Sequence, residues 1–175
     1  MNLYQKSLGK SSWKPKKSPK SIDMTEEKFW LMKSEPDAYS IDTLKNEGVT
    51  LWDGIRNYQA RNFMRKMNKG DKVFFYHSNC KPPGIVGLME VIDLNIVDPT
   101  QFDKDSKYFD PKSKPNNPRW DCVKVKYKFK SDKILSLTEL KILFNEDELL
   151  VVKKVNILSI LPVINDIAKI LLEKI

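Results

Sequence analysis

Residues 120–130 read Trp-Asp-Cys-Val-Lys-Val-Lys-Tyr-Lys-Phe-Lys, and this alternation decides the type of fold. Apolar and cationic side chains take turns: Val123, Val125, Tyr127 and Phe129 against Lys124, Lys126, Lys128 and Lys130. Because successive side chains of a strand point to opposite faces, one face is buried and the other is solvated, as in an antiparallel sheet. We interpret the lysine row first as protection of a sheet edge, and second as a contact with a phosphate backbone.

Strands and helices are expected to alternate on both sides of this segment. Upstream, residues 29–33, 73–78 and 84–93 are apolar runs typical of strands, whereas residues 40–46 and 57–67 have helical spacing, the former ending at Gly48. Downstream, Ser136 and Glu139 form a capping box for a helix through Phe144. A strand near residues 158–161 and a terminal helix follow. Strands separated by helices predict an α+β fold, built as a small mixed β-barrel.

Residues 95–119 interrupt this pattern. They contain four prolines and no apolar periodicity, so we expect a polar loop. Loops of that length in small domains often serve as lids or functional insertions.

The charge of the chain is concentrated at its beginning. The 175 residues carry a net charge of +8, and residues 1–22 contain six lysines and no acid, which accounts for +6 of it. Residues 1–28 are therefore predicted to be a disordered basic arm, followed by one domain at residues 29–175. The arm is interpreted as a nuclear address or a non-specific phosphate contact, with an organelle transit segment as the rival.

Several classes of protein do not fit the composition. No apolar run approaches the roughly 18 residues that a membrane span needs, so no membrane contact is expected. The only histidine, His77, and the two cysteines, Cys80 and Cys122, lack the spacing of a zinc site. We therefore expect neither metal nor cofactor, and a reducing intracellular compartment.

The stretch from Trp52 to Asn62 carries most of the chemistry. It contains Arg56 and Arg61, and with Arg65 these are three of the four arginines in the chain. The planar guanidinium matches phosphates and base edges, and a helix N-terminus beside it, which Asn57 would cap, favours phosphate. An ordinary salt-bridged helix explains the same spacing.

Three further groups of candidate residues lie at strand ends: Trp30, Lys33, Ser34 and Glu35; Tyr76, His77 and Ser78; and Trp120. Ser34 and Glu35 could read the edge of a base, or they are solvated residues at a strand end. Tyr76 and His77 could line the mouth of a pocket, although a lone histidine is more often structural. Trp120, on the solvated face of its strand, needs either a ligand or a cover from residues 95–119.

Together these segments resemble the EVE-domain family. The resemblance covers roughly residues 29–164 and rests on Trp-Leu-Met-Lys-Ser-Glu-Pro at 30–36, Trp-Asp-Gly-Ile-Arg-Asn-Tyr-Gln-Ala-Arg-Asn at 52–62, Gly-Asp at 70–71, Phe-Tyr-His-Ser at 75–78, Gly-Ile-Val-Gly at 84–87 and Trp120. It departs at residues 157–163, which read Ile-Leu-Ser-Ile-Leu-Pro-Val where the family has Arg-Leu-Ser-Val-Gln-Pro-Val.

The resemblance implies a PUA-like β-barrel with flanking helices that takes a modified cytosine, 5-methyl- or 5-hydroxymethylcytosine, out of the base stack. DNA is expected more than RNA as the partner. The implied pocket residues are Trp30, Ser34, Glu35, Trp52, Arg56, Asn57, Tyr76, His77, Ser78 and Trp120. Lys33 and Arg61 are the implied contacts to the nucleic-acid backbone.

We therefore expect a nuclear, monomeric binding module rather than an enzyme. Two alternatives stay open. One is a hydrolase of modified nucleosides, as in similar ASCH-type barrels, with Lys33 and Glu35 as a proton-transfer pair and Ser34 or Cys122 as nucleophile. The other is a protein-interaction module whose aromatic cage takes a methylated side chain.

Overall fold

The computed structural model describes residues 27–175. The basic arm predicted for residues 1–28 lies outside the described residues except at its last two positions. Among residues 27–175, none of the helices combines the length and the apolar character that crossing a bilayer requires.

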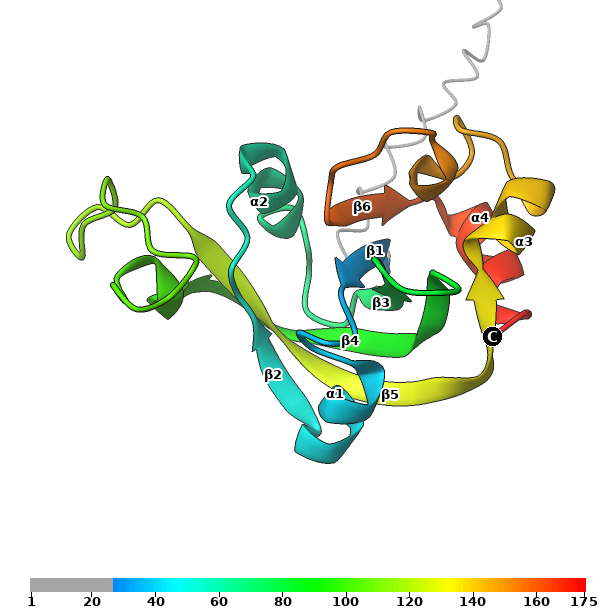
Figure 1. Cartoon of the computed structure of the whole chain (residues 1–175), viewed down its shortest axis with the longest axis horizontal. Helices are drawn as coiled ribbons and strands as arrows, with labels where there is room; N and C mark the ends of the chain where they lie inside the picture. Colours follow the sequence, from blue (N-terminus) through cyan, green and yellow to red (C-terminus); the bar gives the residue numbers. More distant parts are fainter. Residues whose placement is uncertain (1–26) are drawn as a thin grey trace, which may run out of the picture.

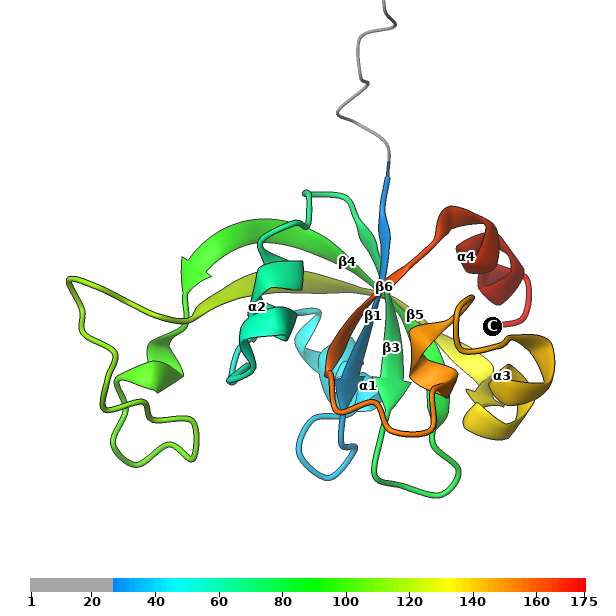
Figure 2. The same ribbon diagram turned by 90° about the horizontal axis from the view of Figure 1, so that it is seen from above.

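Within residues 27–175, a six-stranded mixed sheet forms the frame of the domain (Figure 1). Its strands are β1 (Phe29–Ser34), β2 (Val49–Trp52), β3 (Lys72–His77), β4 (Gly84–Val97), β5 (Asp121–Ser136) and β6 (Ile160–Val163). The order is β2-β5-β4-β3-β1-β6, in which β1 and β3 pair in parallel and the other neighbours pair antiparallel. Several register shifts interrupt the long β4–β5 ladder, which allows these two strands to bend over the rest of the sheet (Figure 2).

In the described part of the chain, four α-helices flank the sheet, so the predicted α+β architecture is confirmed. They are α1 (Ile41–Glu47), α2 (Tyr58–Met64), α3 (Leu137–Leu143) and α4 (Asn165–Leu172). The sequence signals at their ends are present: the Ser40 side chain caps α1, Asn57 caps α2, and Ser136 forms the predicted capping box of α3. Two short 3₁₀ helices, η1 (Pro99–Gln101) and η2 (Leu150–Val152), complete the elements.

The sheet is covered on both faces, and the alternation of β1 shows how. Phe29 and Leu31 join a core cluster with α3 and α4, whereas Trp30 and Met32 join a second cluster with α1 and α2. The second cluster also contains Trp52. The β2–α2 connection therefore begins from a firmly packed residue.

Three expectations about boundaries need correction. β5 has the predicted alternation but continues to Ser136, and β4 continues to Val97, so the loop expected at 95–119 begins later. The short strand β2 was not predicted, because four residues do not establish a period of two. The strand near residues 158–161 is shifted to Ile160–Val163.

Candidate functional site

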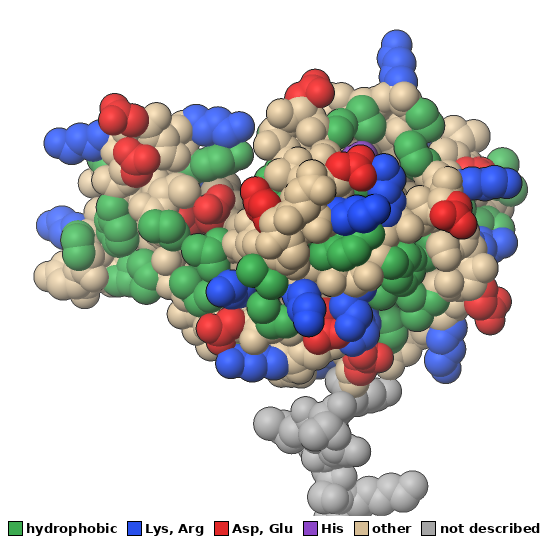
Figure 3. Space-filling model, turned by 90° about the horizontal axis from the view of Figure 1, so that it is seen from below, with side chains coloured by type: hydrophobic (Ala, Val, Ile, Leu, Met, Phe, Trp, Pro, Cys, Tyr) green, Lys and Arg blue, Asp and Glu red, His purple; other side chains and the backbone are tan. Residues whose placement is uncertain are grey.

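A groove of about 1000 Å³ lies between the body of the domain and the lobe formed by residues 98–119. Its walls are the end of β1, the β2–α2 connection at residues 53–57, residues 107–108 of the lobe and residues 156–159 before β6. Figure 3 shows a notch in the molecular surface between the lobe and the body.

The groove brings together seven of the twelve predicted site residues: Lys33, Ser34, Glu35, Trp52, Arg56, Asn57 and Ser78. The other five lie outside its lining: Trp30, Arg61, Tyr76, His77 and Trp120. The lining also contains residues that were not predicted, among them Tyr39, Asp53, Asn79, Lys107, Tyr108, Asn156, Ile157 and Ser159.

Trp52 forms the aromatic part of the groove. Its side chain is packed edge-on against Phe75, with ring centroids 5.3 Å apart, and against Tyr39 at 6.4 Å. The Tyr39 hydroxyl donates to Glu47 at 2.6 Å, and burial together with this carboxylate raises the pKa of Tyr39 to about 12. Trp52 is 7% exposed, so its ring is fixed before any ligand arrives.

Two carboxylates, Glu35 and Asp53, line the same groove. Glu35 accepts a hydrogen bond from the Asn79 side-chain amide at 3.2 Å. Burial raises the pKa of Asp53, the nearby charge of Asp98 raises it further, and the Arg56 guanidinium partly offsets both effects. Asp53 nevertheless keeps an exposed surface at the groove, so a hydrogen-bond donor that enters the groove could reach its carboxylate and stabilise the charge.

Lys33 holds two walls of the groove together. Its ammonium donates to the Asn156 carbonyl at 3.0 Å, and its backbone N–H donates to the Ser159 carbonyl at 2.8 Å. Burial lowers the pKa of Lys33. On the other side of β1, the Ser78 backbone N–H donates to the Ser34 carbonyl at 2.9 Å.

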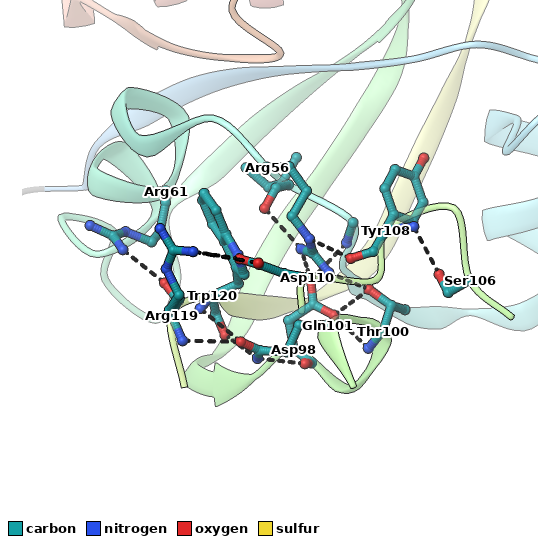
Figure 4. Close-up of polar contacts among 12 residues, drawn as sticks. Arg56, Arg61, Asp98, Thr100, Gln101, Ser106, Tyr108, Asp110, Arg119 and Trp120 are labelled. Atoms are coloured by element: carbon teal, nitrogen blue, oxygen red, sulfur yellow. Dashed lines mark hydrogen bonds and ion pairs between the residues drawn. The ribbon is translucent and has the colours of Figure 1, made fainter. Parts of the chain in front are cut away.

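Arg56 joins the lobe to the body (Figure 4). Its Nε donates to the Tyr108 carbonyl at 2.7 Å, and its Nη2 donates to the Thr100 hydroxyl at 2.8 Å. Its Nη1 donates to the Asp98 carboxylate at 2.8 Å and to the Ile55 carbonyl at 2.9 Å. Arg56 thus lines the groove, but most of its donors are committed to holding the groove wall.

Tyr108, like Tyr39, is an aromatic residue of the groove that was not predicted from the sequence. Its ring lies so close to Gly54 that a Cβ atom there would come within 2.6 Å of a ring carbon. Arg56 lies over one ring face, with its guanidinium carbon 5.7 Å from the centroid. Residues 95–119 carry no periodic pattern, so the only signal for this contact was the glycine after Asp53.

Gly54→Ala should disturb this wall. Gly54 has φ +73°, which already disfavours alanine, and the added methyl group would push the Tyr108 ring away. We expect the free energy of unfolding to fall by about 1–3 kcal/mol, measured by urea denaturation.

Gly48→Ala is the matched control for that substitution. Gly48 has φ +76°, but a Cβ atom there meets nothing within 4 Å. The Gly48→Ala variant therefore measures only the cost of alanine at a positive φ. An equal loss of unfolding free energy in both variants would contradict the role of the Tyr108 contact.

Trp120 and Arg61 belong to the junction between α2 and the lobe rather than to the groove. Trp120 is 4% exposed, so it does not occupy the solvated face that its strand position suggested. It stacks on Tyr58 with ring centroids 4.8 Å apart, and its Nε1 donates to Asp110 at 2.7 Å. Arg61 donates to the Arg119 carbonyl at 2.7 Å. Trp120 was expected to contact either a ligand or residues 95–119, and in the structure it is covered by residues of that loop.

Trp30 and Tyr76 are buried in the interior, and His77, at the end of β3, contacts the start of α1. Trp30 is 4% exposed and donates from Nε1 to Asp71 at 2.8 Å. Tyr76 is 3% exposed and packs in the core cluster of α3 and α4. His77 Nε2 accepts from the backbone N–H of Ile41 at 3.1 Å, and burial lowers the pKa of His77.

Within residues 27–175, no group of three or more His, Cys, Asp or Glu side chains is arranged to hold a metal ion. The cysteines do not pair: Cys122 is buried, and burial together with nearby acids raises its pKa to about 12.

Comparison with known proteins identifies related chains. Human thymocyte nuclear protein 1 is 47% identical over 123 residues, which are 64% of this chain and 55% of that protein. The chain thus spans about half the length of the curated relatives it matches.

Solved structures match nearly over their full length. One is human THYN1 protein in complex with 5-methylcytosine-containing DNA, at 38% identity and TM-score 0.79, covering 85% of this chain and 97% of that one. Another is a crystal structure of a Pseudomonas putida protein, at 41% identity and TM-score 0.80, covering 83% and 97%. The sheet and helices therefore have the PUA-like fold of these neighbours. Residues 28–174 match the sequence model of the EVE domain, and the chain belongs to the EVE-domain family.

Proposed function

We propose that this chain binds DNA containing 5-methylcytosine and holds the modified base in the groove. The human relative solved with such DNA shares the fold and 38% of its aligned residues, which supports a common ligand class. The observation that carries the proposal is the groove itself, because it combines two carboxylates with a fixed aromatic wall. 5-Hydroxymethylcytosine is the second candidate, and a modified RNA base is the third.

The lining suits the edge of a cytosine. The exocyclic N4 amino group of cytosine is a hydrogen-bond donor, and Asp and Glu carboxylates are the acceptors that recognise it. Asp53 and Glu35 supply such acceptors, and the raised pKa of Asp53 marks a carboxylate that would gain from a donor. Trp52, which is 7% exposed, contributes a small fixed apolar surface to the lining, where the methyl group could pack. At about 1000 Å³, the groove has room for the base and its sugar.

Binding rather than catalysis fits the contacts of the candidate nucleophiles and bases. The Lys33 ammonium is directed to the Asn156 carbonyl, while Glu35 accepts from Asn79, so the two do not meet as a proton-transfer pair. Cys122 is fully buried, and its raised pKa keeps it as an unreactive thiol. We therefore propose a binding module.

The direct test is a fluorescence-anisotropy titration of the full chain. DNA duplexes with plain, 5-methyl- and 5-hydroxymethylcytosine, and matching RNA, are compared at two salt concentrations. We expect about fourfold tighter binding to 5-methylcytosine than to cytosine, since one buried methyl group contributes about 0.8 kcal/mol. Salt-steep binding that ignores the modification would contradict the proposal.

Removal of a groove carboxylate sharpens the test. Asp53→Ala and Glu35→Ala should each weaken binding to the methylated duplex by about tenfold. Asp37→Ala is the control, because Asp37 is exposed and outside the groove lining. Since the loss of any acid reduces repulsion from DNA, a general electrostatic effect would strengthen binding, and only a specific contact explains weaker binding.

We also propose that the chain is nuclear and monomeric. The curated relatives carry the name thymocyte nuclear protein 1, which supports this compartment. Imaging of a fluorescent fusion and sizing by light scattering test the two statements separately.

A further inference from the structure

The loop between η2 and β6 exposes two large apolar side chains beside the groove. Val155 is 74% exposed and Ile157 is 83% exposed. Single exposed apolar residues are common on protein surfaces and need no special role. Ile157 differs because it lies on the rim of the groove, where Asn156 and Ser159 also line it.

The backbone on both sides of Ile157 is firmly held. The Asn156 side chain donates to the Leu150 carbonyl at 2.7 Å and accepts from the Leu158 N–H at 2.9 Å. The Lys33 ammonium donates to the Asn156 carbonyl, and the Lys33 N–H donates to the Ser159 carbonyl. The loop therefore presents an exposed isoleucine from a braced frame.

The surroundings of this loop suit a nucleic-acid duplex. Lys153 and Lys154, both exposed, precede the apolar pair in the chain. The lobe contributes exposed Lys107, beside Tyr108, to the lining of the same groove. A duplex seated over the groove would thus meet the cationic Lys107 of the lining, and Lys153 and Lys154 lie close to Ile157 in the chain, which suits a phosphate backbone.

We propose that Ile157 is a wedge that enters the base stack and fills the space left by the base taken into the groove. This inference rests on the proposed function. Extruding a base breaks its stacking with both neighbours, and proteins that distort duplexes insert apolar side chains such as isoleucine between base steps. An isoleucine held rigidly at the mouth of the receiving groove is placed to do this, and it becomes buried only in the complex.

Ile157→Ala tests the wedge, because a wedge matters only where there is a stack to enter. We expect the full-length variant to bind the 5-methylcytosine duplex about tenfold more weakly than the wild type, through the lost apolar burial. Its affinity for the same methylated strand in single-stranded form should change less than twofold. Ile157→Leu should restore duplex binding. Ile142→Ala is the matched control, since Ile142 is 79% exposed on α3, away from the groove.

A second experiment measures the loss of base stacking directly. The fluorescent base analogue 2-aminopurine, placed next to 5-methylcytosine, brightens when it loses its stacking partner. We expect saturating wild-type protein to change this emission strongly, and Ile157→Ala to change it less.

The outcomes separate this inference from the proposed function. A wild type with no preference for the methylated duplex or strand would overturn the proposed function. A wild type with that preference, accompanied by an Ile157→Ala variant with equal duplex affinity, would overturn the wedge alone. Equal weakening on duplex and single strand would also overturn it, since the side chain would then contact the base or backbone.

Discussion

Asp98→Ala is expected to lower the free energy of unfolding by about 3–5 kcal/mol, the range for removing one partner of a buried ion pair. The Asp98 side chain is fully buried and accepts from Arg56 at 2.8 Å and from the Gly54 N–H at 2.9 Å. It also accepts from the backbone and hydroxyl groups of Thr100. Without the carboxylate, Arg56, whose side chain is only 20% exposed, loses its countercharge, and one of the contacts between the lobe and the body is lost.

Urea denaturation monitored by tryptophan fluorescence measures this loss. Asp98→Asn keeps an oxygen acceptor but no charge, so we expect an intermediate loss. Asp93→Ala is the control, because its ion pair with Lys69 is exposed and should contribute little. A loss in Asp98→Ala no larger than that of the control would show that the lobe is held by other contacts.

The free energy of unfolding of the wild type and of the Asp98 variants should depend on pH in a predictable direction. Burial raises the pKa of Asp98, but hydrogen bonds from Arg56, Thr100 and Gly54, together with the charge of Arg56, outweigh burial and hold it below the ordinary value. Stability from the ionised carboxylate is therefore complete above the unfolded pKa of about 3.9 and is lost as the pH falls through the folded pKa. The stability difference between wild type and Asp98→Asn should be constant from about pH 5 to 8 and shrink below about pH 4.

Local patterns in the sequence were sufficient to predict most of the strands and helices that form the frame of the domain. The alternation after Trp120 predicted β5 and its buried face, because a period of two leaves one choice of inner side chains. Ser40, Asn57 and Ser136 marked the helix starts, since a cap depends only on residues within one turn. These signals are local, so a single sequence contains them completely.

The groove could be predicted only in part, because its lobe depends on long-range contacts. Arg56 reaches Tyr108 across 52 residues and Asp98 across 42, within a segment that has no periodicity. Motif residues that follow the ends of strands, such as Glu35, do line the groove. The sequence distinguishes Ile157 only as part of a segment that departs from the family pattern. Exposure of a side chain at the rim of the groove has no sequence signature.

Trp30 illustrates the same limit within a motif. It lies in the segment that carries Glu35, yet the alternation of β1 turns it towards α2, where it meets Phe63 with ring centroids 6.2 Å apart. Its Nε1 partner, Asp71, is 41 residues away and 1% exposed. Whether a motif tryptophan faces a ligand or the core therefore depends on a pairing that no local pattern specifies.

Asp71→Ala is accordingly expected to destabilise the domain by about 3 kcal/mol without altering the groove. Asp71 also accepts from the backbone N–H groups of Lys28 at 3.1 Å and Asn68 at 2.9 Å, so its loss leaves three donors without their acceptor. Trp30→Phe removes only the indole donor, with an expected loss of about 1–2 kcal/mol. Because both variants remove the same hydrogen bond, a double-mutant cycle should give a coupling energy of about 1–2 kcal/mol.

The binding behaviour of Trp30→Phe then decides the role of Trp30. Since Trp30 lies outside the groove lining, the folded variant should keep the wild-type affinity for the 5-methylcytosine duplex, measured well below its unfolding midpoint. Trp52→Phe is the contrasting variant: Trp52 lines the groove, so a smaller ring there should weaken methyl-dependent binding. Loss of the methyl preference in Trp30→Phe, at unchanged secondary structure, would place Trp30 in the binding machinery and contradict its assignment to the core.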